Sequence, residues 1–144
     1  MRSRTGFIPR YWRERRAHYR LEATRCNDCG RVAYPPSNVC RFCGSRNVSR
    51  VDLVDEEARL ITWTAIYAAP EGFERQRPLL IGILETLRSG ARLLARLVDV
   101  RPEELRSGMI MEPVLRRIGE AGEHGLLYYG IAYRPSLRGQ SQGA

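Results

Sequence analysis

The four cysteines of the chain constrain its fold more than any other feature. They stand as two CxxC pairs, Cys26 with Cys29 and Cys40 with Cys43, and the 144 residues contain no further cysteine. Two such pairs in a short chain predict one tetrahedral metal site, usually for zinc. Four thiolates close the coordination shell of the ion, so we interpret the site as structural. A rubredoxin-like iron centre and four reduced, unliganded thiols are the alternatives.

The residues around the cysteine pairs predict a rubredoxin-like zinc ribbon. Gly30 and Gly44 each follow the second cysteine of a pair. A tight turn around sulfur often needs a positive φ, which glycine adopts at little cost. Residues 32–34 between the pairs resemble a short strand that two prolines end. We therefore place the ribbon over residues 24–49.

A helix is predicted over residues 8–20, within an N-terminal helical segment spanning residues 1–23. Pro9 suits the first helical turn. Either the aromatic face of this helix packs on the rest of the chain and the arginine face meets solvent, or the aromatic face or the arginine row docks a partner. Ile8, Trp12 and Tyr19 fall near one face of the helix, and Arg13, Arg16 and Arg20 fall on another.

The pattern changes to short strands after residue 50, which predicts a five-stranded OB-fold barrel over residues 50–135. A flexible tail is expected over residues 136–144, where polar residues and glycine dominate. The fold class is thus mainly β: an N-terminal helix, a zinc ribbon and a barrel. The expected strands cover residues 51–54, 58–69, 79–87, 91–100, 109–118 and 126–133, with one helical turn at 102–105.

The net charge of +8 is distributed unevenly along the chain. The first fifty residues hold twelve arginines against three acidic residues, a net +9, whereas the remainder has a net −1. An anionic partner is therefore expected at the N-terminal half. OB-folds that bind single strands use aromatic rings over a basic groove. The barrel has such rings but lacks the positive charge, so single-stranded nucleic-acid binding is the alternative function and not the first.

Catalytic motifs are missing from the sequence. His18 and His124 are the only histidines, and neither has a nucleophile beside it in sequence. The sequence contains no GxGxxG, P-loop or HExxH pattern, so we predict a protein that is not an enzyme. No apolar run approaches the roughly 20 residues that span a bilayer, and the N-terminus has no signal-peptide core. We expect a cytoplasmic protein without a membrane partner.

Several segments together resemble a known family. These are "YPPSNVCRFCGS" in the ribbon, "APEGFERQRPLLIGILE" and "PEELRSGM" in the barrel, and the closing "GEAGEHGLLYYGIAYRP". They resemble the zinc-ribbon plus OB-fold family once called a domain of unknown function and now described as acyl-CoA-associated. The resemblance covers about residues 8–135 and is closest to the archaeal members.

The resemblance implies a non-catalytic scaffold that bridges acetoacetyl-CoA thiolase and 3-hydroxy-3-methylglutaryl-CoA (HMG-CoA) synthase in the mevalonate route to isoprenoids. The four cysteines match the family's metal ligands without departure, which implies structural Zn²⁺. CoA or acyl-CoA is the implied shared ligand, although no motif assigns its contacts.

Candidate binding residues follow from chemistry and from the resemblance. Arginines of the helix and ribbon suit the phosphates of CoA. The PEGF loop presents Phe73 as an anchor for a partner pocket, and Gly72 beside it permits a close approach. The candidates for partner or CoA binding are Trp12, Arg16, Tyr34, Arg41, Gly72 and Phe73.

Overall fold

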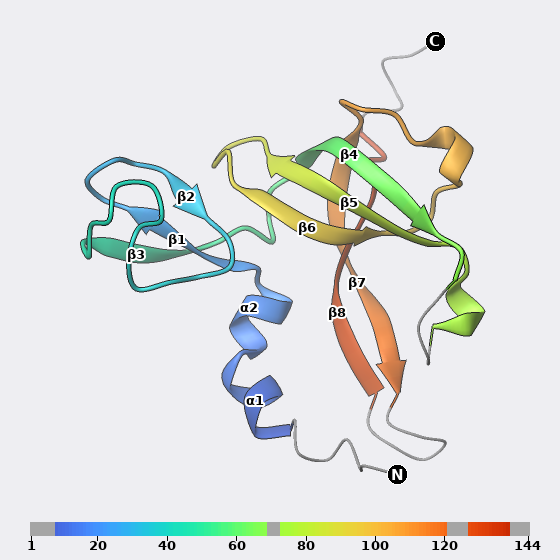
Figure 1. Ribbon diagram of the computed structural model, residues 1–144, viewed down its shortest axis with the longest axis horizontal. Coiled ribbons are helices and arrows are strands. Elements are labelled where there is room, and N and C mark those ends of the chain that lie inside the picture. Colours follow the sequence, from blue (N-terminus) through green and yellow to red (C-terminus); the bar gives the residue numbers. More distant parts are fainter. Residues whose placement is uncertain (1–7, 69–72, 121–126, 139–144) are drawn as a thin grey trace.

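Two β-sheets of different size make up most of the chain (Figure 1). The computed structural model describes residues 8–68, 73–120 and 127–138. A three-stranded ribbon sheet lies on one side, a closed five-stranded barrel lies on the other, and two short helices precede the ribbon. This arrangement confirms the predicted fold class.

The N-terminal helix is broken into two pieces, α1 (Ile8–Arg13) and α2 (Arg15–Tyr19). The helix predicted over residues 8–20 is therefore confirmed as a helical segment, with an interruption at one residue. Glu14 lies between the pieces with φ −94° and ψ 7°. Arginines recur at spacings of three and four residues here, and like charges at those spacings destabilise a helix.

One of our two interpretations expected the aromatic face of the helices to pack on the rest of the chain. The exposure of its two rings contradicts that interpretation. The Trp12 side chain is 70% exposed, and Tyr19 is 42% exposed. The segment is held instead at its C-terminal end. There Leu21 is buried, and the Tyr34 hydroxyl donates a hydrogen bond to the Ala17 carbonyl at 3.3 Å.

The ribbon sheet contains a strand that the sequence pattern did not reveal. Its order is β2-β1-β3, with both pairings antiparallel. The central strand β1 was not predicted because its segment, EATRC, is short and has few β-formers. The predicted strand at residues 51–54 lies instead at residues 48–52 and pairs with β1. The bounds are β1 (Glu22–Cys26), β2 (Val32–Ala33) and β3 (Val48–Asp52).

The barrel has the strand order β4-β5-β6-β8-β7 and closes between β7 and β4. All of its pairings are antiparallel except that of β6 with β8. A 3₁₀ turn precedes the fourth barrel strand, as predicted. The elements are β4 (Ala58–Ile66), η2 (Glu74–Gln76), β5 (Leu79–Thr86), β6 (Arg92–Leu97), η3 (Pro102–Glu104), β7 (Ile110–Glu120) and β8 (Leu127–Pro135).

Alternation along the strands creates the barrel core. On β5, Leu80, Leu84 and Thr86 point inward and are buried, whereas Ile83 points outward and is 39% exposed. Successive side chains of a strand point to opposite faces, so one face fills the barrel and the other meets solvent. The core reaches into the ribbon, because Ala23 and Val32 belong to the same buried cluster.

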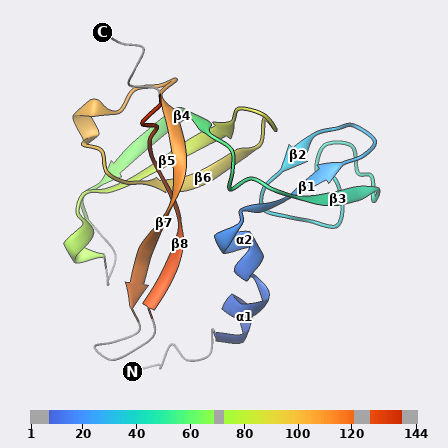
Figure 2. The same ribbon diagram turned by 180° about the vertical axis from the view of Figure 1, so that it is seen from behind.

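The last two strands form a long antiparallel pair. Figure 1 and Figure 2 both show β7 and β8 extending past the other barrel strands, on the same side of the molecule as α1 and α2. Helix α2 also contacts β8. The pairing of β6 with β8 is confined to Leu97 and Tyr133, so the two strands diverge beyond that point.

Candidate metal centre and barrel groove

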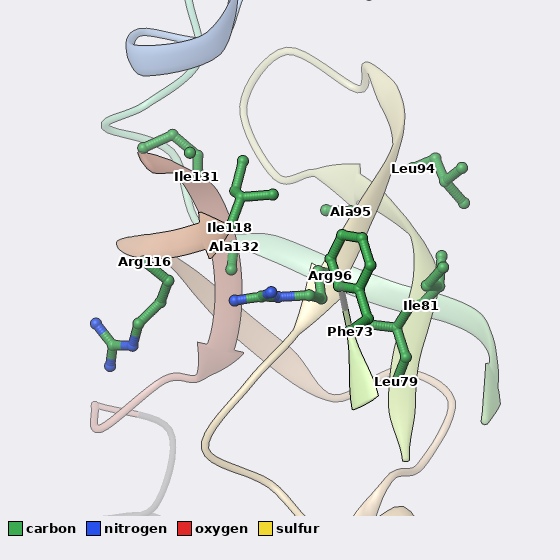
Figure 3. Close-up of a pocket in the computed structure, with 11 residues that line it drawn as sticks. Phe73, Leu79, Ile81, Leu94, Ala95, Arg96, Arg116, Ile118, Ile131 and Ala132 are labelled. Atoms are coloured by element: carbon green, nitrogen blue, oxygen red, sulfur yellow. The ribbon is translucent and has the colours of Figure 1, made fainter. Parts of the chain in front are cut away.

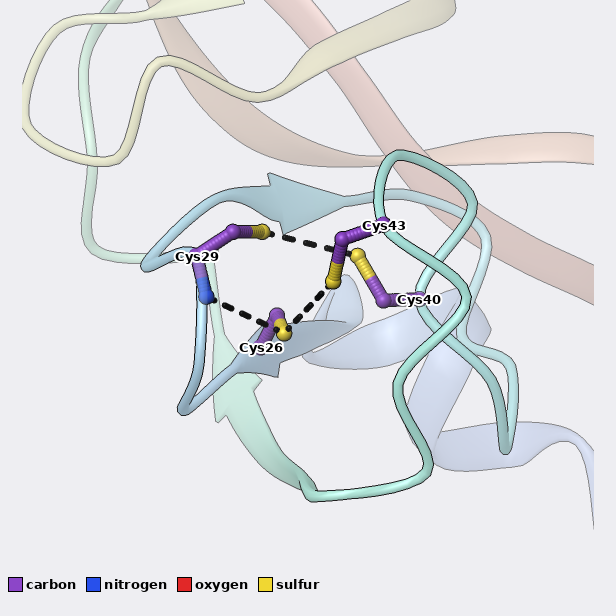
Figure 4. Close-up of side chains that lie close together, drawn as sticks. All are labelled: Cys26, Cys29, Cys40 and Cys43. Carbon is purple, nitrogen blue, oxygen red and sulfur yellow. Dashed lines mark hydrogen bonds between the residues drawn. The ribbon is translucent and has the colours of Figure 1, made fainter.

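The four cysteine sulfur atoms converge at the tip of the ribbon (Figure 4). All lie within 4.8 Å of one another, with Sγ–Sγ distances of 3.5 Å for Cys26 and Cys43 and 3.6 Å for Cys29 and Cys40. A tetrahedral zinc ion with bonds of about 2.3 Å would separate its sulfur ligands by about 3.8 Å. The donor set and its spacing therefore fit zinc.

The two knuckles have the same backbone design. The amide of Cys26 donates to the Arg31 carbonyl at 2.9 Å, and the amide of Gly30 donates to the Cys26 carbonyl at 3.0 Å. Cys40 repeats both bonds with Ser45 and Gly44, at 2.8 and 3.0 Å. The two glycines have φ of +74° and +76°, which confirms why glycine follows each pair.

Backbone amides also point at the sulfur atoms of the buried cysteines. Cys29 N lies 3.4 Å from Cys26 Sγ, and Phe42 N lies 3.4 Å from Cys40 Sγ. Hydrogen bonds from the Cys43 and Phe42 amides lower the pKa of Cys40 to about 6, and the Cys29 amide lowers that of Cys26. These amides stabilise thiolates, the form that binds metal.

The same cluster holds protons on its exposed members. The Ser45 amide lowers the pKa of Cys43, but the Cys26 sulfur and burial outweigh it and raise the pKa to about 12. Sulfur atoms this close cannot all be ionised without a cation between them. Metal binding would therefore release protons from the cluster.

A polar network outside the sulfur atoms ties the two knuckles together. Ser45 Oγ donates to Asp28 Oδ2, and Asn47 Nδ2 donates to Asp28 Oδ1 at 3.2 Å. Asn27 Nδ2 then reaches Asn47 Oδ1 at 3.0 Å. Sequence reasoning missed this network, since short polar residues within the first cysteine pair and just after the second are the only signal it leaves.

The geometry supports a structural role for the metal. Cys26 and Cys40 are buried while Cys29 and Cys43 are exposed, and the four sulfur atoms supply a complete shell. In the described part of the chain this is the one cluster of potential metal ligands. His18 lies 3.7 Å from Glu14 in an exposed pair on the helix, and His124 lies outside the described residues.

An exposed surface of apolar and arginine side chains, here called the knuckle surface, adjoins the metal centre. It consists of Arg31, Val39, Arg41 and Phe42. Phe42 is 50% exposed and Val39 is 42% exposed, and the Arg31 guanidinium lies 5.0 Å from the centre of the Phe42 ring. Arg41, a predicted binding residue, is exposed here.

A second surface, here called the helix surface, consists of Trp12, Arg15, Arg16 and Tyr19. The Arg15 guanidinium lies 4.5 Å from the centre of the Trp12 ring, which keeps the ring beside a positive charge. Arg16 is exposed, as its predicted role in binding requires. Tyr34 has a different environment: it is half-buried, and its hydroxyl bond to Ala17 joins the ribbon to α2.

A third surface is a groove of about 320 Å³ on the barrel (Figure 3). Phe73 lines it, whereas Gly72 lies outside the described residues. The groove runs between β5 and β6 on one side and β7 and β8 on the other, the region where OB-folds bind ligands. The barrel groove is lined by Phe73, Leu79, Ile81, Leu94, Ala95, Arg96, Arg116, Ile118, Gly130, Ile131 and Ala132.

The aromatic rings expected for stacking on nucleic acid do not gather in this groove. Tyr133 is fully buried, and Trp63 packs against the core. Tyr67 and Tyr129 are exposed, but they do not line the groove. Among the described residues Phe73 alone contributes a ring there, which gives the alternative nucleic-acid function little support.

Comparison with known families matches both parts of the chain. The family model for the rubredoxin-like zinc ribbon domain of ChsH2 matches residues 13–49. The model for the C-terminal OB-fold domain of ChsH2 matches residues 51–116. In the described residues we find no helix with the length and apolar character needed to cross a membrane.

Two archaeal relatives match over nearly their whole length, and both are named "DUF35 domain-containing scaffold protein". The one from Pyrococcus furiosus is 38% identical over 92% of this chain and 96% of its own. The one from Methanocaldococcus jannaschii is 34% identical over 92% of this chain and 93% of its own.

Among solved structures, a chain of the "Ltp2-ChsH2(DUF35) aldolase" matches with a TM-score of 0.62. It is 23% identical, over 94% of this chain and 96% of that one. At this level of identity the likeness supports the shared fold, a zinc ribbon followed by an OB-fold.

Proposed function

The chain belongs to the DUF35 family, which joins a zinc ribbon to an OB-fold, and we propose that it is a non-catalytic scaffold for acyl-CoA enzymes. Its proposed partners are acetoacetyl-CoA thiolase and HMG-CoA synthase. Thiolase condensation is thermodynamically uphill and the synthase step is downhill. Holding both enzymes together would pass acetoacetyl-CoA directly to the step that consumes it, in the mevalonate route to isoprenoids.

The scaffold role is supported first by the relatives. The proteins from Pyrococcus furiosus and Methanocaldococcus jannaschii are named scaffold proteins, and they align over almost all of this chain. The metal centre agrees with such a role, because a closed four-sulfur shell can hold a fold together but offers no position for a substrate. Zinc bound by the four cysteines would thus stabilise the ribbon.

The observation that carries the proposal is the set of exposed apolar surfaces on separate elements. A bridge between two enzymes needs at least two places to bind. The helix surface and the knuckle surface lie in the N-terminal part of the chain, and the barrel groove lies in the C-terminal part. Exposed aromatic residues beside arginine, such as Trp12 with Arg15 and Phe42 with Arg31, are typical of interaction hot spots.

CoA enters the proposal as a ligand shared with the enzymes. The exposed guanidinium groups of Arg16 and Arg41 suit the phosphates of a CoA molecule held by a partner. Phe73 would serve as the anchor that the barrel offers to a partner. Arg16 and Arg41 are exposed, so single substitutions can test their roles without disturbing the core.

Co-expression with the two enzymes tests the proposal. The chain should elute with thiolase and synthase in one complex on size-exclusion chromatography. Acetoacetyl-CoA should not accumulate in the medium when the complex turns over acetyl-CoA. Elution of the chain alone at micromolar concentration, with both enzymes free, would contradict the scaffold role.

A matched pair of variants separates the helix surface from general effects of losing an aromatic ring. Trp12→Ala removes a ring that is 70% exposed on α1, and Tyr67→Ala removes one that is 66% exposed on the barrel. If the helix surface docks an enzyme, the first change should weaken the complex by about tenfold or more and the second should not. If both variants bind the enzymes with the same affinity, Trp12 is not part of the binding site.

A further inference from the structure

The barrel closes between β6 and β8 through very little strand pairing. The two strands form a single pair, Leu97 with Tyr133, supported by one hydrogen bond from Val98 N to the Tyr133 carbonyl at 2.9 Å. Before that point, β6 pairs with β5 on one side only, from Arg92 to Arg96. In the described part of the chain no strand pairs with its other side. This stretch of β6 is therefore an edge strand, which presents unpaired backbone N–H and C=O groups.

The exposed face of this edge is apolar at its centre. Leu94 on β6 is 67% exposed, and its cross-strand partner Ile83 on β5 is 39% exposed. Proteins normally protect an edge strand with charge or a covering segment, because an apolar edge invites pairing with another chain. Leu94 also lines the barrel groove, so the apolar edge and the groove form one continuous surface.

Positive charge lines the same groove. Arg96 extends from β6 toward β7 and β8, and Arg116, which already pairs with Asp99, lines the opposite wall (Figure 3). Arg96 donates to two uncharged acceptors, Gln76 Oε1 at 2.5 Å and the Arg117 carbonyl at 3.2 Å. Burial, followed by the charge of Arg116, lowers the pKa of Arg96, so a negative group placed here would be favourable.

We propose that the edge of β6 and the barrel groove bind an extended segment of the partner enzyme, which adds a strand to the barrel beside residues 92–96. The backbone of the segment pairs with β6. Its alternate side chains are apolar and fill the groove near Phe73 and Ile118, and one carboxylate reaches Arg96. This inference rests on the scaffold function and names the surface and the chemistry by which one enzyme docks.

Two other occupants fit the groove less well. A small apolar ligand would fill the space but would leave the edge of β6 and exposed Leu94 uncovered. A second copy paired through the same edge would bring its own Arg96 toward this one, and none of the described residues that line the groove is acidic. An acidic, extended segment from another protein satisfies the backbone, the apolar lining and the charge together.

Hydrogen exchange of the backbone amides tests the added strand directly. The full chain is compared alone and in complex with thiolase, and then in complex with synthase. One of the two enzymes should slow the exchange of amides in residues 92–96 by about tenfold or more, because amides paired in a strand exchange only on opening. The amides of β2 in the ribbon serve as the internal reference.

Two pairs of variants test the side-chain contacts. Leu94→Arg should weaken binding by about tenfold or more, whereas Leu137→Arg, at a residue 64% exposed and outside the groove, should not. Arg96→Gln should weaken binding, whereas Arg59→Gln should not. Arg59 lies on β4, outside the groove and away from residues 92–96, and pairs with Glu85 at 3.3 Å. All four variants should keep the wild-type circular dichroism spectrum.

The outcomes separate this inference from the scaffold function. A complex that forms while exchange at residues 92–96 is unchanged overturns strand addition and leaves the scaffold function standing. If neither enzyme binds, both proposals fall. If the chain without either enzyme showed protection of residues 92–96 that rose with the concentration of the chain, a second copy would occupy the edge. That result would overturn the inference.

Discussion

The ribbon and the barrel are stabilised by different interactions. In the ribbon sheet, Ala23 and Val32 are buried, but the tip is organised by four sulfur atoms within 4.8 Å of one another. The barrel has no such centre among its described residues and depends on large apolar side chains such as Leu60, Leu84 and Met111, which are fully buried. A small sheet with few buried side chains needs a metal, whereas a closed barrel fills its own interior.

The difference extends to the binding surfaces. The ribbon and helices place aromatic rings beside arginines on exposed, local segments, as at Phe42 and Trp12. The barrel forms a groove from five separate segments, between Phe73 and Ala132. Loss of metal should therefore affect the knuckle surface before the groove.

The largest expected effect is that of removing a metal ligand. Cys40→Ser should abolish zinc binding and unfold the ribbon tip while the barrel stays folded, because zinc binding contributes about 10–16 kcal/mol in small zinc-finger peptides. Zinc content per chain and hydrogen exchange of β1–β3 compared with β4–β8 measure this. A variant that retained a full equivalent of zinc would contradict the four-sulfur site. Equal loss of protection from exchange in both sheets would mean that the ribbon and the barrel do not depend on different interactions.

A cavity in the barrel should lower the stability of the barrel and leave zinc binding unchanged, the reverse of the effect of Cys40→Ser. Leu84→Ala should lower the free energy of unfolding by about 2–5 kcal/mol, because the site is fully buried and cannot collapse freely. Zinc content should stay at one equivalent. Leu87→Ala, at a side chain that is 50% exposed just after β5, is the control and should change stability by about 0.5 kcal/mol or less. Chemical denaturation followed by circular dichroism measures both.

Glycines with positive φ occur in both the ribbon and the barrel, so substituting them tests whether zinc affinity depends on the ribbon alone. Gly30 and Gly44 have φ of +74° and +76° in the knuckles, and Gly90 has φ of +66° in a barrel turn. None has an atom within 4 Å of an added Cβ, so alanine should cost only backbone strain of about 1–2 kcal/mol at each site. Zinc affinity, measured by competition with a chelator, should fall for the two knuckle variants and not for Gly90→Ala.

The smallest effect is expected at Tyr133. Its hydroxyl is buried, and no polar atom of the described residues bonds to it. Tyr133→Phe should therefore leave the free energy of unfolding at neutral pH unchanged or raise it by about 1 kcal/mol. A clear loss of stability would mean that the hydroxyl has a partner after all.

The same variant has a distinct pH dependence. Burial, and then the charge of Glu56, raise the pKa of Tyr133 above its ordinary value of 10. The folded chain keeps the proton while the unfolded chain loses it, so this contribution to stability is complete below pH 10 and declines as the pH rises above it. Thermal melts between pH 9 and 11 should show a steeper loss for the wild type than for Tyr133→Phe.

Local sequence determined much of this protein. The spacing of the cysteines and the glycines after them predicted the ribbon, because two ligands with only two residues between them must share one knuckle whatever the rest of the chain does. Runs of β-forming residues bounded by turn residues also predicted most barrel strands, including the one that carries Leu80 and Leu84, because both signals are local to each segment.

Tertiary structure decided what depends on pairing between distant segments. Strand β1 joins the sheet only because β2 and β3 flank it. The barrel groove brings Phe73, Arg96 and Gly130 together through barrel closure and register, which no single segment encodes. Residues near one another in sequence thus fixed the metal centre, whereas long-range pairing created the groove and left the edge of β6 open.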